Sequence, residues 1–174
     1  WAKYAGDDSL EGQLKRQTVE IAGHLANLDY TKVEAMLASM RLQSQGTSLV
    51  AFIERFTALI EVAPDFAFAR FESLRENVRL ATRSGELAAD NDFNDSLYAL
   101  RRLAAYYFVV DDLEGLEEID RQSQSLLEQR FTPIGHNHQL AISAMTAYLQ
   151  GFYNNAHNIS RMAISLSQKM GITS

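Results

Sequence analysis

The stretch GFYNNAHNISRMAISLSQKMG, residues 151–171, carries more pattern than any other part of the chain. Tyr153 follows Gly151 by two residues, and alanines stand at positions 156 and 163. A glycine permits a tight turn, and small residues let two helices approach closely. An apolar stripe at helical spacing then runs on to Met170. The stretch therefore predicts the second helix of a helical hairpin, with Ala163 at a close crossing with its neighbour.

The same helical spacing extends along the whole chain. In residues 48–63, for example, apolar residues recur three and four positions apart, which is typical of a helix with one buried face. No segment alternates with period two, so no strand is expected. The sequence predicts an all-α fold of about eight antiparallel helices in a single domain over residues 1–174. The expected hairpins cover residues 9–43, 48–84, 92–131 and 137–171. Pro64 should end one helix or open the next, because proline lacks the amide hydrogen of a helix interior.

The pattern Gly151-x-Tyr153-x-x-Ala156-x6-Ala163 resembles the second half of a tetratricopeptide repeat. The resemblance is best over residues 137–171 and weaker over residues 14–43, where bulkier residues follow the same spacing. Between these two stretches, Phe66 with Ala69 and Leu113 with Leu116 match the pattern more weakly. The resemblance implies a right-handed stack of hairpins. However, the aligned positions 30, 66, 113 and 153 are unevenly spaced, whereas tetratricopeptide repeats recur about every 34 residues. An irregular helical bundle therefore stays open as the alternative.

Composition argues against several classes of function. The chain has 22 acidic and 16 basic residues and a net charge of −6, so nucleic acid, which requires a basic footprint, is not an expected partner. No apolar run is long enough to insert this segment into a bilayer. The absence of cysteine removes disulfides and thiolate chemistry and leaves both cytoplasm and periplasm open. Because the chain starts with Trp1 instead of methionine, we expect a segment of a longer parent protein, for which a membrane anchor is one option.

Catalytic and metal-binding patterns are also weak. His136 and His138 are the nearest approach to a metal site, but no acid stands beside them, and we expect solvated histidines where a loop enters a helix. The chain has no G-x-S-x-G elbow, no phosphate-binding loop and no G-x-G-x-x-G turn. The sequence therefore predicts a protein that is not an enzyme and that needs no cofactor or metal.

Two groups of residues are candidates for binding. Arg75, Arg79 and Arg83 follow one another at helical spacing and would suit an acidic partner or an anionic ligand, since guanidinium groups bind carboxylates and phosphates in bidentate fashion. Acidic residues interleaved with this row make a simple solvated surface the competing interpretation. Tyr98 and Tyr106 are the second group, as tyrosines that would line a groove.

Together these features predict a noncatalytic recognition module, the input or assembly part of a larger regulatory protein. Its partner would be a protein, a peptide, a small anionic ligand or a second copy of the chain. The alternative is an extracytoplasmic helical sensor domain of a bacterial membrane receptor, because residues 9–40 would suit a long helix that leaves a membrane segment and a second helix packed back on it.

Overall fold

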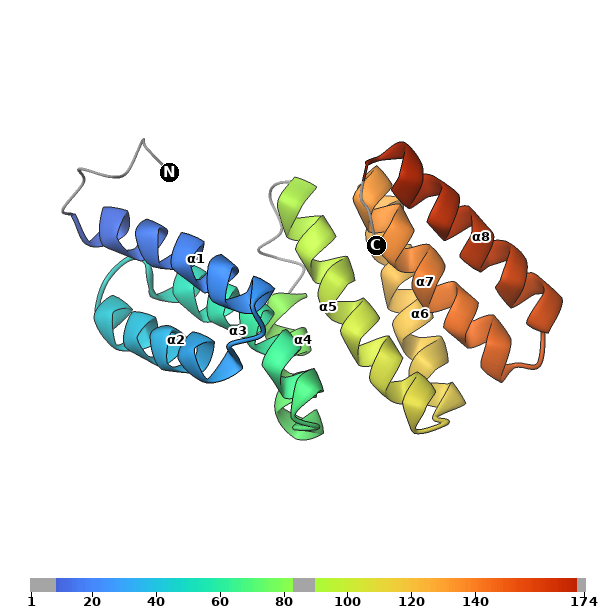
Figure 1. The fold of residues 1–174 in the computed structure, drawn as a ribbon, viewed down its shortest axis with the longest axis horizontal. Helices are drawn as coiled ribbons and strands as arrows, with labels where there is room; N and C mark the ends of the chain where they lie inside the picture. Colours follow the sequence, from blue (N-terminus) through green and yellow to red (C-terminus); the bar gives the residue numbers. More distant parts are fainter. Residues whose placement is uncertain (1–8, 83–89, 172–174) are drawn as a thin grey trace.

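The computed structural model describes residues 9–82 and 90–171, apart from the side chains of residues 11, 15 and 90–92. Within these ranges the chain forms α-helices and no strand, which confirms the all-α prediction. The helices succeed one another in chain order from one end of the molecule to the other (Figure 1). Their bounds are α1 (Leu10–Ala26), α2 (Tyr30–Ser44), α3 (Val50–Ala67), α4 (Phe71–Ala81), α5 (Asp90–Val109), α6 (Leu113–Gln129), α7 (Pro133–Leu149) and α8 (Tyr153–Lys169). None of these helices combines the length and the apolar character that a membrane crossing requires.

Side-chain caps explain where several helices begin. The side chains of Ser9, Asp29, Asp112 and Thr132 each accept a hydrogen bond from the backbone amide three residues further on. Such caps satisfy amides that have no partner inside the helix. Pro133 follows its cap as the first residue of α7, where its missing amide hydrogen costs nothing. The last hairpin therefore begins at Pro133, one helical turn earlier than the sequence suggested.

One turn geometry joins the two helices of every hairpin. The residues Leu28, Ala69, Asp111 and Gly151 have φ angles of 58°, 55°, 59° and 82°, in the left-handed region. In each turn the amide of the next residue donates to the carbonyl five residues earlier, at N–O distances of 2.8–2.9 Å. This is the Schellman arrangement at a helix C-terminus. Because the second helix starts directly after it, all four hairpins share the same local connection.

The shared turn corrects the alignment proposed from sequence. Helix α3 runs through Pro64 to Ala67, so Phe66 lies inside it and the pairing of Phe66 with Ala69 was wrong. A proline so close to the end removes only one intrahelical hydrogen bond, and the helix continues for another turn. The second helices start at Tyr30, Phe71, Leu113 and Tyr153. The interval between the starts of successive second helices is nearly constant, at about 40 residues. It is longer than the roughly 34 residues of a tetratricopeptide repeat.

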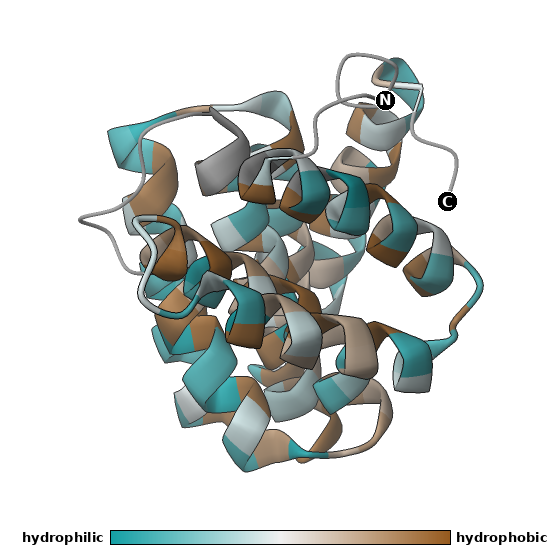
Figure 2. Cartoon of the chain, turned by 90° about the vertical axis from the view of Figure 1, so that its left-hand side faces the viewer, coloured by the Kyte–Doolittle hydropathy of each residue, from teal (hydrophilic) through white to brown (hydrophobic). Residues whose placement is uncertain are grey.

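Two groups of buried apolar side chains form the core. The larger group extends from α3 to α7 and includes Leu74, Leu97, Leu116 and Ile142. The smaller group joins α1 and α2 to α3. Figure 2 shows apolar and polar residues on the same helices, as expected for helices that bury one face and expose the other.

A buried carboxylate fastens the second hairpin. The side chain of Asp65, at the end of α3, is only 3% exposed and lies 3.1 Å from Nε of Arg70. Its other oxygen accepts a hydrogen bond from Nδ2 of Asn77 on α4 at 2.8 Å. Arg70 also pairs with Glu34 on α2. A buried charge is tolerated when it is paired and hydrogen-bonded in this way, and the network links the first two hairpins across their turns.

The small residues of the last hairpin divide into two groups. Ala144, Ala147 and Ala156 are buried where α7 and α8 pack together. Ala163 lines the same groove as Ala144 and Ala156 but is only half-buried, so no helix covers it as a close helix crossing would, and its predicted place at such a crossing was wrong. The reason is that α8 has no following helix beside it among the described residues, and one side of it stays open.

These positions predict opposite responses to the same substitution. Ala156→Leu should lower the free energy of unfolding by about 1–3 kcal/mol, because a larger side chain overfills a tight crossing. Ala163→Leu, the matched control on the same helix, should change it by less than about 0.5 kcal/mol. Urea unfolding of both variants measures the difference, and equal losses would show that Ala163 is packed as tightly as Ala156.

The turn geometry makes a second prediction. An L-residue in the left-handed region costs about 1–2 kcal/mol relative to glycine. Glycine keeps only part of this advantage, because it also gives the unfolded chain more conformational entropy. Ala69→Gly should therefore stabilise the protein by about 0.5–1 kcal/mol, and Gly151→Ala should destabilise it by about 1 kcal/mol. Thermal and urea unfolding test both signs. A loss of stability in Ala69→Gly would contradict the left-handed turn at Ala69.

Candidate recognition groove

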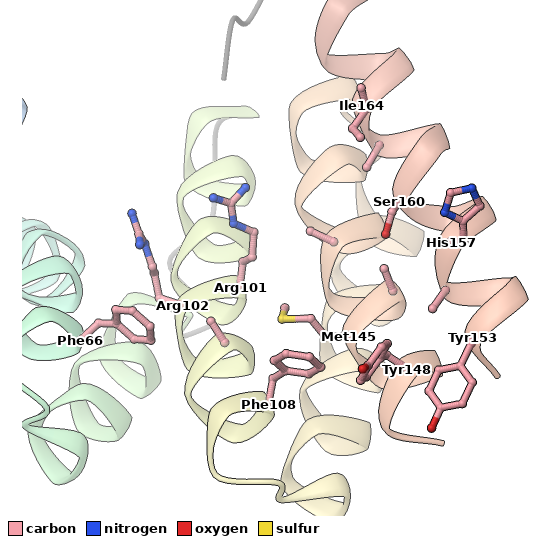
Figure 3. A pocket seen from close by; sticks show the side chains of 15 residues that line it. Phe66, Arg101, Arg102, Phe108, Met145, Tyr148, Tyr153, His157, Ser160 and Ile164 are labelled. Atoms are coloured by element: carbon pink, nitrogen blue, oxygen red, sulfur yellow. The ribbon is translucent and has the colours of Figure 1, made fainter. Parts of the chain in front are cut away.

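A groove of about 710 Å³ runs between α5, α7 and α8. Ala141 and Met145 of α7 form its floor, Phe108 belongs to the α5 wall, and Ser160 belongs to the α8 wall. Figure 3 shows Phe108 and Met145 directed toward one another in the space between the helices. Phe66, at the end of α3, extends the α5 wall.

Most of the groove is apolar, and much of its apolar surface faces solvent. Tyr148, Tyr153 and Ile164 are 51%, 61% and 58% exposed. The rings of Phe108 and Tyr148 meet edge to face with centroids 5.6 Å apart, and Tyr148 meets Tyr153 in the same way at 5.1 Å. A contiguous exposed apolar surface of this kind is typical of an interaction site, in contrast to single exposed side chains.

Two adjacent arginines stand on the α5 wall. Nη1 of Arg101 lies 3.3 Å from Nδ1 of His138, and Nε of Arg102 donates to the Tyr98 hydroxyl at 3.2 Å. The Arg102 guanidinium also lies over the rings of Tyr98 and Phe66, at 5.2 and 5.8 Å from their centroids. Within residues 9–82 and 90–171 the structure pairs neither guanidinium with a carboxylate. The arginines are held by aromatic rings and neutral acceptors, and their positive charges are not balanced locally.

Burial, with a contribution from the two arginine charges, keeps the neighbouring His138 neutral. Burial lowers the pKa of His138 to about 4, and the positive charges of Arg101 and Arg102 contribute to the shift. Burial also lowers the pKa of Arg101, with the charge of Arg102 as the next cause. An arginine stays protonated even so. His138 is therefore neutral at pH 7, and its Nδ1 accepts a hydrogen bond from Arg101.

The arginine row proposed from sequence does not contribute to this groove. Arg79 forms two hydrogen bonds with the Glu76 carboxylate, at 2.6 and 2.9 Å, on the solvated face of α4. Arg75 lies 3.7 Å from Glu72 and over the rings of Tyr106 and Tyr107. Arg83 lies outside the described residues. Arg75 and Arg79 thus have acidic partners on their own helix, and a binding role for the row stays a prediction.

The two tyrosines that we expected to line a groove, Tyr98 and Tyr106, contact different residues. Tyr98 contacts Arg102 and meets His138 edge to face, with centroids 5.8 Å apart. Tyr106 stacks against Phe71 of α4 at a centroid distance of 3.9 Å. Tyr98 therefore supports the arginine pair from the side, whereas Tyr106 belongs to the contact between α4 and α5. Their role in binding stays a prediction.

The histidines differ from the solvated loop residues that we expected. Both His136 and His138 lie within α7, and His138 is held among Tyr98, Arg101 and Arg102. The expectation failed because Thr132 and Pro133 start the helix before the histidines. In the described part of the chain, no three histidine or acidic side chains gather closely enough to hold a metal ion.

The sequence contains a local signal that sets this arginine pair apart from the Arg75 row. A surface arginine on a helix commonly has an acid three or four residues away, as Arg75 and Arg79 do. Arg101 and Arg102 have only leucine, tyrosine and alanine at those positions. The other groove residues, alanines and aromatics at helical spacing, look the same in sequence as core residues.

The neutral state of His138 predicts a pH-dependent stability. Its folded pKa of about 4 lies below the unfolded value of about 6.5, so the unfolded chain takes up the proton first as the pH falls. This histidine should cost about 2–3 kcal/mol of stability between pH 6.5 and 4, and the loss should be absent in His138→Gln. Urea unfolding at pH 7.5 and pH 4 measures it, with the exposed His157→Gln as control. Equal pH dependence in wild type and His138→Gln would contradict the assignment.

Comparison of the chain with family models, with curated proteins and with solved structures finds no match.

Proposed function

We propose that this chain is a noncatalytic recognition module that receives a segment of a partner protein in the groove between α5, α7 and α8. The observation that carries the proposal is the exposed apolar groove of about 710 Å³ with two arginines that lack a carboxylate partner. Apolar surface supplies affinity, and a few polar groups fix orientation. A stack of evenly spaced hairpins, as the resemblance to tetratricopeptide proteins implies, suits a rigid binding surface.

The chemistry of the groove favours binding over catalysis. Its ionisable side chains are two arginines, one histidine and two tyrosines, with no carboxylate or thiol among its lining residues. Ser160 and His157 lie three residues apart on α8, but no hydrogen bond joins them among the contacts of the described residues. An activated serine requires such a base within hydrogen-bond reach. Recognition therefore accounts for these residues better than acid–base or nucleophilic chemistry does.

A sensor domain that binds a small molecule is the second candidate. The groove volume of about 710 Å³ lies within the range of about 300–1,000 Å³ that is typical of small-molecule sites. The groove is open along one side, however, whereas such sites usually enclose most of their ligand. We therefore place a protein segment first.

Selection from a random 12-residue peptide library displayed on phage tests the proposal. We expect enriched peptides that lose at least tenfold in affinity for Ile164→Glu, because this residue lies in the groove and a buried carboxylate there is costly. Met162→Glu is the matched control, since Met162 is equally exposed on α8 but lies outside the groove. Peptides that bind both variants as well as the wild type, or no enrichment at all, would contradict a recognition role for this groove.

A further inference from the structure

The last two hairpins can be aligned residue by residue through their turns. The amide of Asp112 donates to the carbonyl of Tyr107 at 2.9 Å, and the amide of Phe152 donates to the carbonyl of Ala147 at 2.9 Å. The residue before each donor, Asp111 in one turn and Gly151 in the other, has the left-handed backbone. With these two residues aligned, each residue of the α5–α6 hairpin has a counterpart in the α7–α8 hairpin.

The α5–α6 hairpin already holds a helix, namely α7. On the α5 side, His138 of α7 meets Arg101 and Tyr148 meets Phe108. On the α6 side, Asp120 accepts a hydrogen bond from Ser143 at 2.7 Å, and Glu117 accepts one from Gln150 at 2.8 Å. Four positions, 101, 108, 117 and 120, thus mark the surface on which α7 packs.

The counterparts of these four positions all line the groove. They are Ala141 and Tyr148 on α7 and His157 and Ser160 on α8. Tyr148 and His157 are exposed, and Ala141 and Ser160 are half-buried, so no described helix packs on them as α7 packs on the α5–α6 hairpin. Tyr148 contacts the rings of Phe108 and Tyr153. The groove therefore repeats, at aligned positions of the last hairpin, the surface that α7 occupies one hairpin earlier. Figure 3 shows Tyr148, His157 and Ser160 along it. Its lining residues thus correspond to those of a surface that a helix covers.

The side chains that line the groove differ in size and in charge from their counterparts on the α5–α6 hairpin. Ala141, Ala156 and Ala163 stand where the α5–α6 hairpin has Arg101, Leu116 and Ser123, so a helix with apolar side chains has room to approach. The acids Glu117 and Asp120 are replaced by His157 and Ser160, and no carboxylate lines the groove. The charges that do line it are Arg101 and Arg102 on the α5 wall. A half-buried guanidinium without a counter-charge favours a partner that supplies one.

We propose that the groove binds an amphipathic helix of a partner protein, packed on α7 and α8 as α7 packs on α5 and α6. The edge of that helix nearest α5 carries aspartate or glutamate side chains that pair with Arg101 and Arg102. This inference rests on the proposed function and adds to it the conformation and the charge of the partner segment.

A library of 17-residue helices tests the proposal. Apolar positions at i, i+3, i+4 and i+7 vary among alanine, leucine, methionine and phenylalanine, and the flanking edge positions vary among glutamate, glutamine and lysine. We expect selection on the intact chain to enrich glutamate over lysine along one edge, and selection on the Arg101→Gln/Arg102→Gln double variant to lose that preference. A melting temperature within a few degrees of wild type shows that the double variant is folded.

Titration of the best helix by fluorescence anisotropy then separates the outcomes. The double variant should bind at least tenfold more weakly, whereas Arg121→Gln/Arg161→Gln, which removes two exposed arginines outside the groove, should bind within twofold of wild type. A proline in the middle of the helix should abolish binding. Groove-dependent peptides that are neither helical nor acidic would overturn the inference and leave the proposed function standing. The proposed function and this inference would both fail only if no selected peptide or helix depended on Ile164 for binding. Two further results would overturn the inference. One is a concentration-dependent dimer of the chain that Ile164→Glu abolishes. The other is binding of sodium citrate with the same affinity as the helix.

Discussion

The turn between the two helices of each hairpin is the constraint on which the rest of the structure depends. One residue in the left-handed region and one hydrogen bond across five residues end the first helix, and the second helix begins at once. No flexible loop remains between them, so the turn fixes the angle at which the helices meet. Four such turns recur at a nearly constant interval along the chain. The last two junctions between hairpins also repeat, because α5 packs on α3 and α4 as α7 packs on α5 and α6, whereas α3 packs on α2 without contacting α1. From α3 onward, equivalent positions on successive hairpins therefore meet similar neighbours.

The groove follows from this regular stacking. Each hairpin has a surface on which the first helix of the next hairpin packs, and the α7–α8 hairpin has no next helix among the described residues. Its surface is left with aromatic and small residues, such as the exposed Tyr148 and the half-buried Ala163, on which no further described helix packs. The same geometry that builds the core between α3 and α7 therefore also produces an open apolar groove at the end.

The arginines of this groove differ from several other arginines of the surface in their partners. Arg79 and Arg121 each pair with a glutamate one helical turn away, and exposed pairs of this kind contribute little to stability. Arg70 is part of a network with the buried Asp65. Arg101 and Arg102 have neither kind of partner, and they depend on aromatic rings, the Tyr98 hydroxyl and a neutral His138. In a protein with a net charge of −6, these two adjacent arginines are the basis of the proposed site for an acidic group.

The sequence by itself determined the class of fold and the approximate extent of each hairpin, because apolar residues three and four positions apart require helices with one buried face. It also placed the turn at Gly151, where glycine reports the left-handed backbone directly. It did not place the turn at Ala69, since nothing local marks an alanine for that conformation and Pro64 suggested an earlier end. The groove was decided by tertiary structure alone. Ala156 and Ala163 have the same local pattern, and only the packing of α8 on α7, with no helix beyond it among the described residues, buries one and leaves the other open to solvent.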